Sequence, residues 1–129
     1  MLIFQMSMGT VSAATTDIVK IKVTLVSAEL TENNHVGNEW ATLFYVNDTS
    51  LEAGESLELK LKKTEKVFLE AYAEEQDKIP DVGSEEYSIK AKDIKKTIKK
   101  SLTVTVTENR GRYSGNTATW TFSFTIEKV

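Results

Sequence analysis

Carboxylates are the side chains of this sequence best suited to chemistry, and they concentrate in one stretch. Between positions 70 and 86, seven acidic residues stand against the single Lys78, which gives a net charge of about −6. The chain's only proline, Pro80, stiffens this stretch. Ca²⁺ takes roughly six to eight oxygen ligands, and carboxylates on a constrained loop can supply them. The stretch therefore predicts a calcium site, whose ligands we expect to be Glu75, Asp77 and Asp81.

Three carboxylates leave such a site incomplete. Backbone carbonyls near Lys78 and Ile79 could add oxygens if the loops lie at the same end of the domain, and so could the side chains of Glu32, Asn33, Asn34 and Asp48. The alternative interpretation is a solvated acidic loop whose charge protects a strand edge from aggregation. Both interpretations stay open from the sequence.

A second candidate site lies in the polar stretch 108–117. It contains the only two arginines of the chain, Arg110 and Arg112, together with Tyr113 and Asn116. Two glycines in the same stretch permit a tight turn that presents these side chains outward. Arginine and tyrosine in a shaped loop favour recognition of a carboxylate, a phosphate or a sugar. In the alternative, an arginine pairs with the acidic loop and Tyr113 covers the core.

Catalysis is not indicated by the sequence. The only histidine, His35, lies among turn residues, and there is neither a glycine-rich phosphate loop nor a nucleophile elbow. A carbohydrate-active enzyme working through two carboxylates would need one of them in an apolar pocket, with the pair roughly 5–10 Å apart. We therefore expect a protein that is not an enzyme, with a carbohydrate-active enzyme as the weakest alternative.

The elements that must position these side chains are β-strands. Apolar and polar residues alternate with a period of two along most of the chain, as in half-buried strands, and polar turn-forming residues separate the segments. Residues 93–100 change period, since Ile94, Ile98 and Leu102 recur every four residues, and this predicts a short helical turn. The expected strands cover residues 17–25, 40–46, 56–62, 67–73, 85–92, 102–107 and 118–126.

This pattern predicts an all-β fold, an antiparallel β-sandwich of about seven to eight strands with at most a short helical turn near 93–100. The strands are expected to be antiparallel because their alternation is one-sided and no crossover helices separate them. We expect two regions: a signal-peptide remnant or disordered N-terminus at 1–16, and a single β-sandwich domain at 17–129.

The first 16 residues suggest the location of the protein. An apolar stretch leads into Ser12, Ala13 and Ala14, small residues of the kind that signal peptidase accepts. The sequence therefore predicts a secreted or extracytoplasmic protein. A disordered or edge-pairing N-terminus is the alternative. We expect no transmembrane segment, because no stretch approaches the roughly 18 apolar residues that a span requires.

The net charge of −3 argues against a nucleic-acid partner, since phosphate backbones are bound by basic surfaces. Six lysines between positions 90 and 100 form a local basic cluster. We expect these lysines to be solvated surface charge.

The run VFLEAYAEEQDKIPDVGSEEYSIKAKDI resembles the central signature of C-two domains, the calcium- and phospholipid-binding β-sandwiches. In that family an apolar strand enters an Asp-rich loop, and Gly83 and Asp93-Ile94 hold the later positions of the pattern. The first strand, IVKIKVTLVSAEL, is also similar to the family's opening strand. The resemblance implies calcium-assisted binding of an anionic lipid, and it implies that a basic face, such as the six lysines between positions 90 and 100, binds the lipid headgroups. However, the family's Asp-x-Asp pair is replaced here by Ala73 and Glu75, so the standard calcium ligand set is incomplete.

Together these features predict an exported, non-catalytic binding or interaction module whose ligand binding or membrane-surface binding is assisted by Ca²⁺. The expected partner is a protein, an anionic lipid or a glycan. The main alternative is a structural or assembly protein of the cell envelope or extracellular space, which would bind a protein partner through an edge strand.

Overall fold

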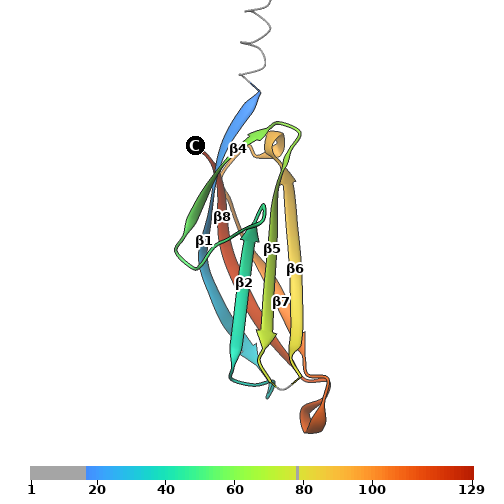
Figure 1. Ribbon diagram of the computed structural model, residues 1–129. Coiled ribbons are helices and arrows are strands. Elements are labelled where there is room, and N and C mark those ends of the chain that lie inside the picture. The colour runs from blue at the N-terminus through green and yellow to red at the C-terminus, as the bar shows by residue number, and fades with distance from the viewer. Residues whose placement is uncertain (1–16, 78) are drawn as a thin grey trace, which may run out of the picture.

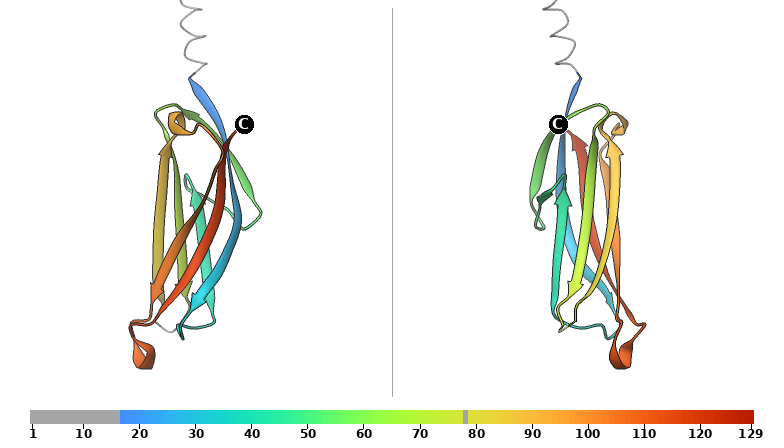
Figure 2. Two further views of the ribbon diagram at one scale, coloured as in Figure 1. Left: turned by 180° about the vertical axis from the view of Figure 1, so that it is seen from behind. Right: turned by 45° about the vertical axis from the view of Figure 1, so that its right-hand side comes forward.

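The computed structural model describes residues 17–77 and 79–129, which form two four-stranded antiparallel sheets packed face to face (Figures 1 and 2). The strand order is β4-β1-β8-β7 in one sheet, which we name sheet A, and β3-β2-β5-β6 in the other, sheet B. The strands are β1 (Ile18–Asn33), β2 (Trp40–Val46), β3 (Thr49–Ser50), β4 (Ser56–Lys62), β5 (Lys66–Glu75), β6 (Asp81–Lys90), β7 (Ile98–Thr107) and β8 (Thr117–Lys128).

The core forms where the inward faces of the two sheets meet. Alternate residues of the long strands are buried, as period-two patterning requires. Phe44 of sheet B lies against Phe122 and Phe124 of sheet A, with ring centroids 6.0 and 6.1 Å apart. On β5 the buried positions are Val67, Leu69, Ala71, Ala73 and Glu75. The β5 face that points into the core therefore ends in a carboxylate.

The predicted antiparallel β-sandwich is confirmed, and so are most of the strands. The strands predicted at 40–46 and 56–62 have the expected bounds. The first strand is longer than expected and runs from Ile18 to Asn33, because it pairs with β4 over its first half and with β8 over most of its length.

The helical turn occurs earlier than predicted, as a single 3₁₀ turn at Ala91–Asp93 (η1). Ile98 already belongs to β7, where it pairs with Ile126. A spacing of four residues fits one face of a helix and equally every second inward position of a strand. Here Ile94 is buried after the 3₁₀ turn, whereas Ile98 and Leu102 face inward from β7. The spacing alone could not separate these two cases.

The predicted acidic loop is shorter in the structure, because β5 extends through Glu75 and β6 already begins at Asp81. Glu75 and Asp81 are paired across the two strands. Two of the three expected calcium ligands therefore lie at strand ends and not in the loop. The prediction that the strand ended at residue 73 was wrong, since backbone pairing with β2 and β6 continues past it.

Three connections meet at one end of the sandwich (Figure 1, bottom): residues 34–39 between β1 and β2, 76–80 between β5 and β6, and 108–116 between β7 and β8. We name this end the loop end; the C-terminus lies at the opposite end. The predicted signal-peptide remnant at 1–16 lies outside the described residues. In the part of the chain that the structure describes, no helix has the length and apolar character needed to cross a bilayer.

Candidate functional site

The three connections of the loop end are joined to one another by specific contacts. The backbone N–H of Gln76 donates to the carbonyl of Glu39 at 2.6 Å, which ties the β5–β6 connection to the β1–β2 connection. The ring of His35 stacks on Tyr113, with centroids 4.7 Å apart and planes 13° from parallel. The loop end is thus one continuous surface, and it holds the residues of both sites that the sequence singled out.

Glu75 is the most unusual residue of this end. It occupies the last inward position of β5, and its side chain is only 3% exposed. Its Oε2 accepts a long hydrogen bond from the backbone N–H of Glu39, at 3.4 Å. Its Oε1 is buried and has no hydrogen-bond partner among residues 17–77 and 79–129. Buried carboxylates normally have donors, so this oxygen is an exception.

Burial raises the pKa of the Glu75 carboxyl above its ordinary value. The neighbouring carboxylate of Asp77 and the negative charge of Glu108 raise this pKa further, while the N–H of Glu39 lowers it. Glu75 is therefore a buried acid in a negative environment. Such a carboxyl gains stability either from a proton or from a cation.

Asp81 faces Glu75 across the hairpin and is also nearly buried, at 4% exposed. It differs in having a side-chain donor, because Nδ2 of Asn109 donates to its Oδ1 at 3.0 Å. Asn109 lies in the β7–β8 connection, so this bond fastens that connection onto the start of β6. Asn109 stabilises the charge of one of the two buried carboxylates and leaves the other without a comparable partner.

Gly37 covers the other side of Glu75. A Cβ added at Gly37 would overlap Oε2 of Glu75, and the φ of this glycine is +146°. Its carbonyl accepts hydrogen bonds from Nδ2 of Asn33, at 2.6 Å, and from Nε1 of Trp40, at 3.1 Å. The first connection is therefore held rigidly against the Glu75 carboxylate, and only glycine leaves room for this approach.

Asp77, the third expected calcium ligand, is exposed on the connection itself. With Ile79, Glu108 and Arg110 it lines an open hollow of about 300 Å³. Arg110 forms no ion pair within 4.0 Å with either acid of this hollow, judged over the described residues. Nor do any three acidic or histidine side chains of residues 17–77 and 79–129 form a group that could hold a metal ion.

The other predicted ligand-binding residues lie on the β7–β8 connection, which contains a 3₁₀ turn at Gly111–Tyr113 (η2). Tyr113 is 40% exposed and stacks on His35, so it lies outside the core. The guanidinium of Arg112 lies 5.7 Å from the Tyr113 ring. The carbonyl of Asn116 accepts from the N–H of Glu108, which closes this connection as a hairpin. The two arginines and Tyr113 are thus exposed together at the loop end, and Asn116 is a half-buried residue of the same connection.

The proposed supplementary ligands are divided between two places. Asn33 is at the loop end, where its side chain holds the first connection through Val36 and Gly37. Asp48 follows the far end of β2, in the turn before β3, and is not at the loop end. Sequence reasoning missed Gly37, Glu39, Glu108 and Asn109 as neighbours of the acidic pair, because only the packing of three separate connections brings them there.

Neither a protein-family model nor a curated protein matches this chain.

Proposed function

We propose that this protein is an exported, non-catalytic binding module whose loop end binds its ligand with the help of Ca²⁺. One observation carries the proposal: the carboxylate of Glu75 is buried, and its Oε1 has no hydrogen-bond partner within residues 17–77 and 79–129. A buried, ionised and unpaired carboxylate is costly, so at neutral pH this site favours a cation.

The cation would be held by oxygens from three places. Glu75 and Asp81 supply carboxylates from paired strand ends, and Asp77 lies two residues beyond Glu75 on the connecting segment. Because these three carboxylates do not already form a group that could hold a metal ion, their side chains would have to rearrange on binding. Ca²⁺ tolerates irregular shells of hard oxygen ligands, which makes it the divalent ion that best suits such a site.

The ligand would be an anionic headgroup or an acidic glycan. Arg110, Arg112 and Tyr113 lie at the same end as the acidic pair, and Asn116 belongs to the same connection. Arginine binds carboxylate and phosphate through paired hydrogen bonds. A bound cation would cancel the negative charge that otherwise repels an anion from this end. The resemblance to C-two domains supports the same combination of calcium and anionic ligand.

The test is thermal unfolding of the full chain in excess CaCl₂ and in chelator, with MgCl₂ as the ionic control. A ligand at 100 times its dissociation constant stabilises by about 2.7 kcal/mol, which raises the midpoint by several degrees. We expect this rise for Ca²⁺, and we expect Glu75→Gln and Asp77→Asn to abolish it. Glu58→Gln, an exposed change on β4, is the matched control. An equal midpoint in calcium and chelator would overturn the calcium-assisted function.

A further inference from the structure

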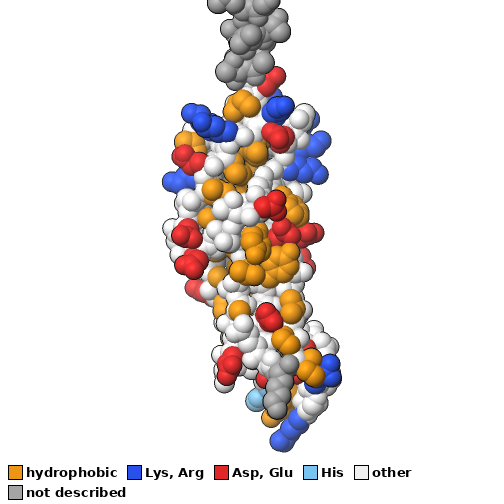
Figure 3. Space-filling view, in the orientation of Figure 1, with side chains coloured by type: hydrophobic (Ala, Val, Ile, Leu, Met, Phe, Trp, Pro, Cys, Tyr) orange, Lys and Arg blue, Asp and Glu red, His pale blue; other side chains and the backbone are white. Residues whose placement is uncertain are grey.

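The outward face of sheet B is a second surface with distinctive chemistry, on the opposite side of the sheet from the buried carboxylates. The cross-strand register places its side chains in rows over β2, β5 and β6. One row contains Tyr45, Glu70 and Glu86, and the next contains Leu43, Tyr72 and Ser84. Figure 3 shows a hydrophobic patch in the middle of this side of the molecule, with acidic side chains around it. We name these two rows the tyrosine face.

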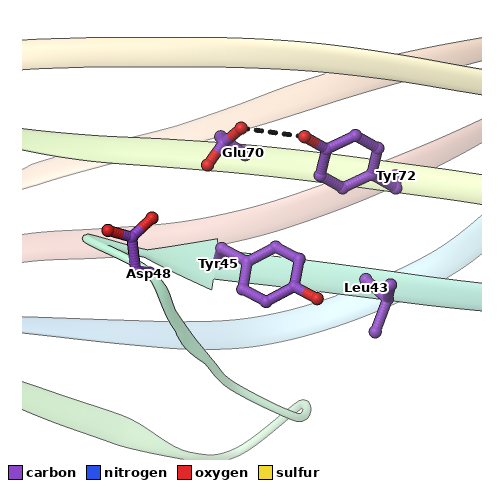
Figure 4. Close-up of a pocket in the computed structure, with 5 residues that line it drawn as sticks. All are labelled: Leu43, Tyr45, Asp48, Glu70 and Tyr72. Atoms are coloured by element: carbon purple, nitrogen blue, oxygen red, sulfur yellow. Dashed lines mark hydrogen bonds between the residues drawn. The ribbon is translucent and has the colours of Figure 1, made fainter.

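The tyrosine face contains an open hollow of about 340 Å³, lined by Leu43, Tyr45, Asp48, Glu70 and Tyr72 (Figure 4). The two tyrosine rings meet edge to face, with centroids 6.0 Å apart and planes at 79°. The hydroxyl of Tyr72 donates to Oε2 of Glu70 at 2.8 Å. Leu43 is 49% exposed beside them. The hollow thus combines aromatic rings, an aliphatic wall and two carboxylates.

Charge on the tyrosine face is one-sided. Glu70 and Glu86 are directly opposite one another on adjacent strands, an arrangement that destabilises a sheet. Neither of them forms an ion pair within 4.0 Å with any residue in the described part of the chain. The hydrogen bond to Glu70 raises the pKa of the Tyr72 hydroxyl, and the charges of Glu70 and Glu86 add to this effect. The face therefore presents an uncompensated negative potential beside aromatic rings.

We propose that the tyrosine face binds a lysine- or arginine-bearing segment of a separate protein partner. The charged end of such a side chain would lie between the carboxylates of Asp48 and Glu70 and against the ring of Tyr45, an arrangement that combines charge-assisted hydrogen bonds with a cation–π contact. Its methylene groups would cover Leu43. The cation would also relieve the repulsion between Glu70 and Glu86.

A sugar fits the tyrosine face less well than a cation. Sugar rings bind to flat aromatic surfaces, whereas Tyr45 and Tyr72 are nearly perpendicular and offer no shared platform. An anionic surface such as a lipid headgroup layer would be repelled by Asp48, Glu70 and Glu86. Charge complementarity therefore selects a basic protein segment, and this inference does not depend on the calcium-assisted function of the loop end.

The test is a titration of the ¹⁵N-labelled full chain, in chelator, with the peptide acetyl-Gly-Arg-Gly-Arg-Gly-amide. Its glutamine counterpart, acetyl-Gly-Gln-Gly-Gln-Gly-amide, is the neutral control. We expect saturable shifts of the amides of residues 43–48, 70–72 and 84–86 with the arginine peptide only. The double variant Glu70→Gln/Glu86→Gln should weaken this binding at least tenfold, and it should stay folded because it removes a repulsive pair. The matched control Glu58→Gln should bind as the wild type does.

Several results would overturn the proposal. Equal shifts with the glutamine peptide, or unchanged affinity in the double variant, would show that the carboxylates do not select the ligand. Shifts of the same amides by cellohexaose but not by the arginine peptide would assign the face to a glycan. The same amides could also shift without peptide as the protein concentration rises. If the double variant Lys99→Gln/Lys100→Gln, which removes two lysines of the cluster between positions 90 and 100, abolishes those shifts, the occupant is a second copy of this chain.

Discussion

Glu75 and Asp81 face each other at one end of the β5–β6 pairing, and both side chains are nearly buried, yet only Asp81 accepts a hydrogen bond from a side chain. Two like charges in register already destabilise a hairpin. Here both carboxylates are also buried, and Oε1 of Glu75 has no hydrogen-bond partner in the described residues. The charges of this pair therefore destabilise the folded protein, and binding a proton or a cation would relieve that destabilisation.

Replacing Glu75 by glutamine should stabilise the protein at pH 7 in chelator. The substitution keeps the shape of the side chain and removes its buried charge. Because a buried charge without a partner is costly, we expect a gain of about 1–2 kcal/mol. The measurement is urea unfolding followed by tryptophan fluorescence. Glu74→Gln is the control, because Glu74 points outward from the neighbouring position of β5 and should change stability little. A loss of stability in Glu75→Gln alone would contradict this account.

The same carboxyl should make stability depend on pH in a predictable direction. Its pKa in the folded protein is raised above the ordinary 4.5, so between that value and the folded pKa the folded state binds more protons than the unfolded state. The free energy of unfolding must then fall as the pH rises through this window. Compared with Glu75→Gln, the wild type should be less stable at pH 7 and should approach the variant as the pH falls toward 4.5. A difference that is constant over pH would show that Glu75 is not the titrating group.

The outline of this fold could be predicted from the sequence, and the reason lies in the alternation of residues such as Val67, Leu69 and Ala71. A period of two fixes which face is buried whatever the neighbouring strand is. The same alternation assigns Glu75 to the buried face, but a carboxylate at that position was interpreted as part of the loop. Glu75 is the end of a strand because it pairs with Asp81 on β6, and this pairing cannot be recognised from the residues around Glu75 alone.

The neighbours of the acidic pair could not be predicted, because they come from connections far apart in the chain. Asn109 reaches Asp81 and Gly37 approaches Glu75 only once both sheets have packed. The tyrosine face is a different case. Its alternation of Phe68, Glu70 and Tyr72 was visible, but the hollow also needs Tyr45 from β2, and the sequence gives no strand order.

Asn109 should be the residue that makes the burial of Asp81 tolerable. Changing Asn109 to alanine leaves the Asp81 carboxylate without its side-chain donor, and we expect a loss of about 1–3 kcal/mol, the usual cost of an unsatisfied buried group. Calorimetric unfolding at pH 7 in chelator measures it. Asp81→Asn combined with Asn109→Ala should recover part of the loss, because a neutral amide needs the donor less. If the effects of the two changes simply add, Asn109 and Asp81 do not interact directly.

Gly37 offers the sharpest test of how closely the first connection packs on Glu75. Alanine at this position combines two costs: a positive φ, and overlap of the new Cβ with the Glu75 carboxylate. We expect Gly37→Ala to destabilise by about 2–4 kcal/mol, above the roughly 1 kcal/mol for backbone strain alone. Gly54→Ala is the matched control, since Gly54 also has a positive φ, +92°, but has no atom within 4 Å of an added Cβ. Adding Glu75→Ala to Gly37→Ala should remove the extra loss of stability relative to Gly54→Ala, because the overlapping carboxylate is then gone. Equal losses for Gly37→Ala and Gly54→Ala would mean that Gly37 is required only for its backbone conformation and that the connection can move away from Glu75.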